Sequence, residues 1–203
     1  MPVFAGVYPS ALLARAHANV GIHSAGITRR RFFLGCEGQS EHSYGTLLQH
    51  LADSVPLHIH IELHDLRGGD PLAIVESAIA RLVRQIRTRG SFVARALLLD
   101  DDQLGQNPAR DAQIQPLVIE HRLLLVWQRP CHKALLLRHL PGCESLRPQN
   151  SLAANLHLSR YWQDYKKPMS ANRLLEKIGL AELASAASVE PDLAILLTLL
   201  GLP

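Results

Sequence analysis

Several classes of protein are excluded by what this sequence has little of. Only 5% of its 203 residues are aromatic, and its three cysteines form no CxxC pair. A disulfide framework is therefore not expected, and a reducing compartment such as the cytoplasm fits best. The most apolar stretch, 193–202, is about half of the roughly 20 residues that a membrane-spanning helix needs. The sequence also has no Walker A loop, no GxGxxG motif and no serine nucleophile elbow.

Acidic residues are absent from the first 30 positions, which include Arg15, Arg29 and Arg30. An acid-free start that contains arginine is a feature of organellar transit peptides. Chain termini are also commonly poorly ordered, and this is the interpretation we favour. We therefore predict that 1–29 is a poorly ordered or loosely packed N-terminal tail.

The overall composition is that of a folded chain with an aliphatic core. Hydrophobic residues make up 47% of the sequence and charged residues 19%, which excludes disorder throughout. The formal net charge is +3 at pH 7. A mildly basic balance permits a nucleic-acid partner but does not require one.

Apolar runs that predict strands alternate with amphipathic segments that predict helices. The expected strands are 31–36, 57–63, 92–99 and 122–127, and the expected helices are 40–52, 71–88, 108–120 and 130–140. Ser40 and Asp70 are the predicted N-caps of the first two helices. Alternation of this kind is typical of βαβ units. We predict an α/β domain over 30–145, with a parallel sheet of about four strands flanked by helices, and a helical C-terminal extension over 146–203.

Acidic side chains follow two of the expected strands. Glu37 follows the first strand, and Asp100 and Asp102 follow the third. Ligands of open parallel sheets bind outside the carboxyl ends of the strands, so these residues should converge there. In an extended segment Asp100 and Asp102 point the same way, whereas Asp101 points elsewhere. Their oxygens favour Mg²⁺ or Mn²⁺, and crowding should raise their pKa values. The alternative interpretation is a solvated acidic turn.

A family resemblance becomes visible at these residues. The stretch Cys36–Glu41 (CEGQSE) resembles the signature of RloB-like proteins, a branch of the Toprim superfamily, in which an apolar strand precedes Cys-Glu-Gly, two residues and Glu. The stretch Leu97–Asp102 (LLLDDD) is similar to the Toprim Asp-x-Asp motif. Three further segments resemble later elements of the family, and the resemblance covers about 30–167: Gly69–Pro71, Pro130–His139 and Tyr165–Lys167.

The resemblance implies a Toprim-like fold and Mg²⁺- or Mn²⁺-dependent phosphoryl transfer on nucleic acid, as in a nuclease. Glu37 would be the general acid or base, Asp100 and Asp102 the metal-binding pair, and Glu41 a further acid of the site. RloB-like proteins are associated with restriction and phage-defence loci, which implies a cytoplasmic protein and a protein partner from a defence system. The resemblance identifies neither the substrate nor the oligomeric state.

One position departs from the family pattern. The RloB-like fourth helix carries a Phe-Glu-Leu-Trp core, and its glutamate falls on Lys133 in this chain. Lys133 could replace a metal ion at the acidic site, which makes it a candidate catalytic residue, or it could lie on an exposed helix face. The alternative function is accordingly a degenerate Toprim domain that binds nucleic acid or a partner protein without cutting.

Other residues support weaker hypotheses. Arg30 and Arg31 could contact phosphates. A phosphatase of the haloacid-dehalogenase type, with Asp100 as nucleophile, ranks last because Leu104 stands where that family has threonine. One face of the second strand carries side chains that could bind Zn²⁺, although such a set is more often a polar strand face: His58, His60, Glu62 and His64.

Overall fold

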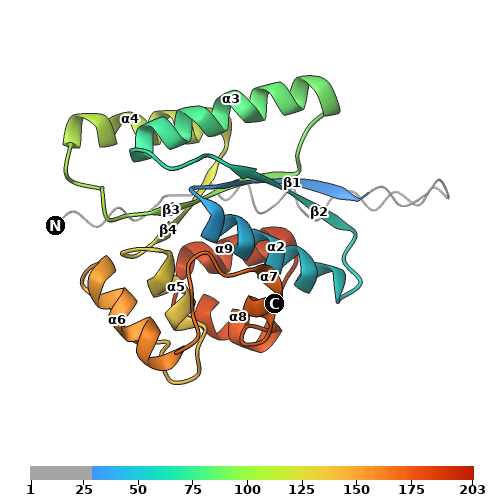
Figure 1. Cartoon of the computed structure of the whole chain (residues 1–203). Coiled ribbons are helices and arrows are strands. Elements are labelled where there is room, and N and C mark those ends of the chain that lie inside the picture. The colour runs from blue at the N-terminus through green and yellow to red at the C-terminus, as the bar shows by residue number, and fades with distance from the viewer. Residues whose placement is uncertain (1–28) are drawn as a thin grey trace.

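A computed structural model describes residues 29–203, so the predicted N-terminal tail lies, apart from Arg29, outside the described residues. Four strands form one parallel sheet in the order β2-β1-β3-β4 (Figure 1). They are β1 (Arg30–Cys36), β2 (Ile59–Asp65), β3 (Ala94–Asp100) and β4 (Leu124–Gln128). The predicted α/β fold with a four-stranded parallel sheet is confirmed.

The second strand lies two residues later than the prediction. Its pairing with β1 joins Arg30 to Ile59 and Cys36 to Asp65, so the hydrogen-bond register rather than the apolar pattern sets its ends. Leu57, which belongs to that apolar pattern, precedes the strand and packs against the core from the connecting segment.

Helices cover both faces of the sheet (Figure 1). One face is covered by α3 (Pro71–Arg89) and α4 (Pro108–His121). The other is covered by α2 (Gln39–Asp53), α5 (His132–Arg138) and the C-terminal helices. These last are α6 (Ser151–Tyr161), α7 (Ala171–Leu175), α8 (Leu180–Ala187) and α9 (Pro191–Leu200). Because both faces are covered, β3 and β4 consist largely of apolar residues, whereas the edge strand β2 alternates apolar and polar residues.

Successive side chains of β1 enter two different cores. Phe33 packs with Leu97 and Leu99 beneath α3 and α4. Phe32 and Leu34 point the opposite way, into the larger core shared by α2 and the C-terminal helices. This alternation follows from the two-residue period of a strand. Each face of the sheet therefore has its own hydrophobic support.

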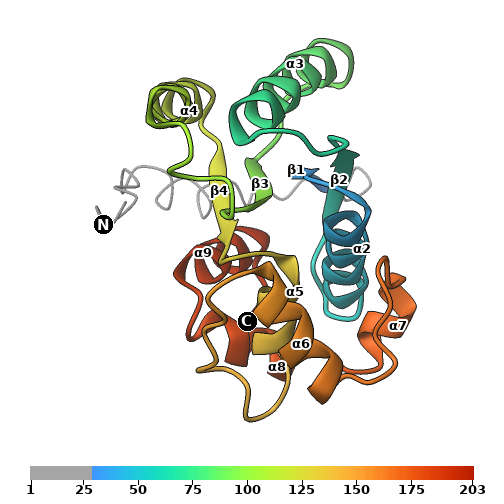
Figure 2. The same ribbon diagram turned by 60° about the vertical axis from the view of Figure 1, so that its left-hand side comes forward.

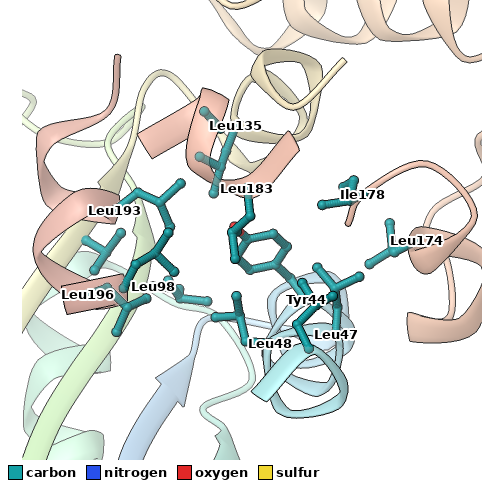
Figure 3. Packing of buried hydrophobic residues seen from close by; sticks show 14 of the residues in the cluster. Tyr44, Leu47, Leu48, Leu98, Leu135, Leu174, Ile178, Leu183, Leu193 and Leu196 are labelled. Atoms are coloured by element: carbon teal, nitrogen blue, oxygen red, sulfur yellow. The ribbon is translucent and has the colours of Figure 1, made fainter. Parts of the chain in front are cut away.

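The C-terminal extension contributes to the main core. Figure 3 shows Ile178, Leu183 and Leu193 around the Tyr44 ring and Leu48 of α2. In Figure 2, α7 lies beside α2 and α9 lies below β4, and both pairs are in contact. The predicted helical extension over 146–203 is thus present, and it completes the hydrophobic layer on one face of the sheet.

A buried ion pair ties α9 to α5. The Arg138 guanidinium and the Glu190 carboxylate approach to 2.8 Å, and both side chains are almost fully buried. Arg138 also donates to the carbonyls of Arg129 and Leu146. Removing one partner of such a pair leaves the other charge buried and unpaired, which lowers the free energy of unfolding by about 3–5 kcal/mol.

The starts of the first two helices differ in chemistry. Asp70 caps α3 as predicted, because its Oδ1 accepts hydrogen bonds from the backbone N–H groups of Leu72 and Ala73. The predicted Ser40 cap of α2 is wrong. Gly38 occupies that position, and its N–H donates to Glu41 Oε2 at 3.1 Å. Ser40 is instead buried in the first turn.

Close packing of α2 on the sheet depends on Gly45. A Cβ atom at that position would overlap the Leu63 side chain of β2. The absence of a side chain lets the helix approach the sheet, and so fixes where its first turn, with Glu41, lies. Within the described part of the chain, no helix combines the length and the apolar character needed to cross a membrane.

Candidate functional site

The carboxyl ends of β1 and β3 are joined by hydrogen bonds through acidic side chains. Glu37 Oε2 accepts a hydrogen bond from the backbone N–H of Asp100 at 2.9 Å. Asp100 Oδ1 in turn accepts from the backbone N–H of His132, at the start of α5, at 2.7 Å. Parallel pairing of β1 with β3 brings these ends together. We call Glu37, Glu41, Asp100 and Asp102 the acidic site.

Burial perturbs two carboxyl groups of this site. Burial and, to a smaller extent, the charges of Glu37 and Glu41 raise the pKa of Asp100 to about 8, against the hydrogen bond from His132. Burial also raises the pKa of Glu37, which the hydrogen bond from Asp100 and the charge of Lys167 partly offset. Crowding was the expected cause, but loss of hydration is the larger one.

Asp102 reaches the acidic site through a turn and not along an extended strand. β3 ends at Asp100, and the N–H of Leu104 donates to the carbonyl of Asp101 at 3.0 Å. Asp102 is exposed, accepts a hydrogen bond from Ser151 Oγ at 3.0 Å, and its charge raises the pKa values of Asp100 and Glu37. Asp101 points away, toward Arg129 at 3.6 Å.

Glu41 forms the buried side of the acidic site. Only 3% of its surface is exposed. Its Oε2 caps α2 at Gly38, and its Oε1 lies 3.7 Å from Nδ1 of the buried His132 ring. Burial lowers the pKa of His132, so the ring is neutral. Glu41 therefore orders the start of α2 as well as adding negative charge, while His132 Nδ1 is paired with Gln128 Nε2 at 2.9 Å.

Of the two lysines near this site in the described part of the chain, it is Lys167, not Lys133, whose charge acts on its residues. The charge of the exposed Lys167 lowers the pKa values of Glu37 and His132. Lys133 is half-buried on α5 and makes no hydrogen bond or ion pair with any residue of 29–203. Its neighbour His132 contacts Asp100 through the backbone. The sequence analysis proposed Lys133 as the cation of this site and did not single out Lys167.

Arg30 and Arg31 lie far from the acidic site, at the opposite end of β1 from Glu37. Arg31 donates to Glu62 at 2.7 Å and to the carbonyls of Arg89 and Gly90. The structure therefore does not bring these two arginines together with the predicted catalytic and metal-binding residues.

The acidic site leaves carboxylate oxygens that the described residues do not use. Among the described residues, Glu37 Oε1, Asp100 Oδ2 and Asp102 Oδ1 accept no hydrogen bond, so each carboxylate retains one free oxygen. No group of three or more His, Cys, Asp or Glu within 29–203 is placed so that it could hold a metal ion. Mg²⁺ is usually held by only one or two carboxylates, together with substrate phosphates and water, so the metal-binding role of Asp100 and Asp102 stays a prediction.

The histidines of β2 have no such arrangement. The His64 ring stacks on Phe33, with centroids 4.5 Å apart, and lies 3.5 Å from Glu62. His60 is exposed on the strand. No zinc-binding group forms from these side chains in the part of the chain that the structure describes.

Sequence reasoning missed three contributors to the site. The backbone N–H of His132 and the Ser151 hydroxyl leave no trace in composition or spacing. Tyr165 lies beside Ser40 and Glu41, and burial raises its pKa to about 12. The Tyr165–Lys167 segment was visible only as one part of the family resemblance.

Comparisons with known proteins add no relative. No protein-family model, no curated protein and no solved structure matches this chain significantly. The resemblance to RloB-like proteins therefore stays a prediction that rests on the motifs quoted above.

Proposed function

We propose that this chain is a Mg²⁺- or Mn²⁺-dependent enzyme that cleaves or transfers phosphodiester bonds of nucleic acid, in the manner of a Toprim nuclease. The observation that carries the proposal is the hydrogen-bonded sequence from Glu37 to Asp100 to His132 at one edge of the sheet. It holds two carboxylates of separate strands close together, each with one oxygen free.

In this proposal the residues have separate roles. Asp100 and Asp102 hold the metal ion, which would neutralise charge on the phosphate and activate the attacking oxygen. Glu37 moves the proton as general acid or base, a role suited to a carboxyl group whose pKa is raised above its ordinary value. Glu41 adds buried negative charge that favours a cation. A cytoplasmic location and a defence-system partner belong to the same proposal, and gene neighbours would test them.

One observation favours a second function, a domain that binds nucleic acid without cutting it. Backbone N–H groups already engage one oxygen of Glu37 and one of Asp100, and Lys167 supplies a positive charge that acts on Glu37. These contacts compensate part of the negative charge that a metal ion would otherwise neutralise. The two functions differ in whether product forms.

Glu37→Gln is the decisive variant. Glutamine keeps an oxygen that can accept the hydrogen bond from Asp100 N–H, but it cannot carry the proton. Plasmid DNA, single-stranded DNA and single-stranded RNA are incubated with wild-type protein and millimolar Mg²⁺ or Mn²⁺. We expect cleavage by the wild type and a loss of at least about 100-fold in the variant, as for removal of a general acid or base.

Glu76→Gln is the matched control, since Glu76 is exposed on α3 and the change removes the same charge. It should cut like the wild type. If wild type binds nucleic acid but forms no product with any substrate or metal, the non-cutting function is correct. If Glu37→Gln cuts as fast as wild type, Glu37 has no part in the chemistry.

A further inference from the structure

An open hollow lies beside the acidic site without including any of its acids. Its volume is about 340 Å³, which falls within the range of small-molecule sites. Three of its lining residues, Gln39, His42 and Ser43, come from the first turns of α2, Asp65 comes from the end of β2, and Pro168 comes from the segment before α7. Three separate parts of the chain thus form its wall.

The hollow adjoins Glu37 on the side away from the metal-binding pair. Asp65 pairs with Cys36, the residue before Glu37, and Gln39 follows Glu37 by two positions. Pro168 follows Lys167, whose charge acts on Glu37. Asp100 is on β3, on the other side of β1 from β2. Neighbouring β-strands are only about 4.8 Å apart. A nucleic acid with one phosphate at Glu37 would therefore place the adjacent nucleotide at the hollow.

The chemistry of the hollow suits a base better than a phosphate. Asp65 Oδ1 accepts a hydrogen bond from Arg67 N–H at 2.8 Å, and its Oδ2 accepts none from any described residue. The polar side-chain atoms of Gln39, His42 and Ser43 likewise make no hydrogen bond within 29–203. A carboxylate is an acceptor only, so it repels phosphate and selects a ligand that carries N–H groups.

We propose that this hollow is a base-binding subsite that receives an unpaired base next to the scissile phosphodiester and prefers bases with an exocyclic amino group. Asp65 accepts from the amino group, as acidic side chains do from cytosine N4. The Pro168 ring contacts the face of the base, while Gln39, His42 and Ser43 bond its remaining edge. The inference rests on the proposed function and narrows its substrate to single-stranded or locally unpaired nucleic acid.

Asp65→Asn tests the preference, because asparagine keeps an oxygen for Arg67 N–H and removes the charge. Binding of labelled homopolymers of adenine, cytosine and thymine or uracil is measured by fluorescence anisotropy in the Glu37→Gln background, which prevents cleavage. We expect adenine and cytosine homopolymers to bind about tenfold tighter than thymine or uracil ones, a difference that Asp65→Asn removes. Glu76→Gln in the same background should retain it, and Ser43→Ala gives a second variant at the hollow.

Cleavage of the same homopolymers by protein with intact Glu37 separates this inference from the proposed function. If the base preference depends on Asp65 but no product forms, the subsite is supported and the proposed enzymatic function is overturned. Product formation with the same affinities in Asp65→Asn and its parent supports the enzyme and overturns the subsite. Equal weakening of all homopolymers by Asp65→Asn also overturns the subsite, and failure of every homopolymer to bind overturns both.

Discussion

The two ends of the central sheet handle charge in opposite ways. At the amino end of β1, Arg31 meets Glu62 at 2.7 Å and two backbone carbonyls, and its guanidinium lies 4.3 Å from the Phe92 ring centroid. At the carboxyl end, Glu37 and Asp100 approach each other, and neither forms an ion pair with a cation of the described residues. Both ends of β1 lie between β2 and β3, so the strand order alone does not explain why the two ends differ.

In our interpretation, the charges at the amino end stabilise the fold, whereas those at the carboxyl end serve a ligand. A paired, half-buried ion at the amino end is satisfied by the protein itself. The carboxyl end keeps buried acids whose pKa values are raised, an arrangement that costs stability and is characteristic of functional sites. If the interpretation is correct, substitutions at the two ends should change stability in opposite directions.

The largest expected effect is on the pH dependence of stability. The pKa of Asp100 is about 8 in the folded chain against an ordinary value of 3.8, so the native state binds more protons between these values. Stability should therefore fall as pH rises from about 4 to 8, by at most about 6 kcal/mol from this group. Asp100→Asn removes that loss, so in metal-free buffer the variant should be more stable than wild type at pH 8.5.

Urea unfolding at pH 5 and pH 8.5 measures this difference. Asparagine retains an oxygen for the hydrogen bond from His132 N–H, so the local structure is kept. An equal loss of stability between the two pH values in wild type and Asp100→Asn would show that Asp100 is not the group responsible.

The next effect concerns metal binding at the carboxyl end. Mn²⁺ should stabilise the fold by mass action, by about 2.7 kcal/mol at a hundred times its dissociation constant. Asp102→Asn should abolish most of the accompanying rise in melting temperature, because one of the two proposed metal-binding carboxylates is lost. Ser151→Ala is the control, since it removes only the hydrogen bond to Asp102. No Mn²⁺-dependent shift in wild type at millimolar concentration would exclude the metal-binding role.

A smaller effect is expected at the amino end. Glu62→Gln removes the anion that pairs with Arg31 at 2.7 Å, and only 12% of the Glu62 side chain is exposed. The free energy of unfolding at pH 7 should fall by about 1–2 kcal/mol, since a partly buried charge loses its partner. Asp102→Asn without metal should show no such fall. Equal stability of Glu62→Gln and wild type would remove the contrast between the two ends.

The sequence predicted those parts of the contrast that follow from local patterns, and not those that depend on contacts between distant residues. The apolar runs predicted buried strands, and Asp70-Pro71 predicted the start of α3, because burial and helix capping each require particular residues close together in the sequence. The positions of Glu37 and Asp100 at strand ends were visible for the same reason. Their approach required only that the two strands pair in parallel, which the alternation of strands and helices predicted.

The remaining features depend on contacts that no local pattern records. The partner of Arg31 is 31 residues away, and the choice between a phosphate contact and an internal ion pair was decided by strand order. The expected cap at Ser40 failed because Glu41 reaches back to Gly38. The effect of Lys167 on Glu37 required the chain after α6 to return to the carboxyl end of the sheet.

The smallest effect distinguishes the two lysines near the carboxyl end. Lys167 lowers the pKa of Glu37, so Lys167→Gln should raise it, by a fraction of a pH unit because the ammonium group is exposed to solvent. Lys133→Gln should leave it unchanged. The pKa can be followed by ¹³C NMR of the Glu37 carboxyl group, with or without catalysis.

If Glu37 acts as a base, the acid limb of the pH–rate profile should move to higher pH in Lys167→Gln alone. High salt should move the limb of wild type the same way, since screening weakens the same interaction. A shift in Lys133→Gln with none in Lys167→Gln would reverse the assignment and restore Lys133 as the cation of the site.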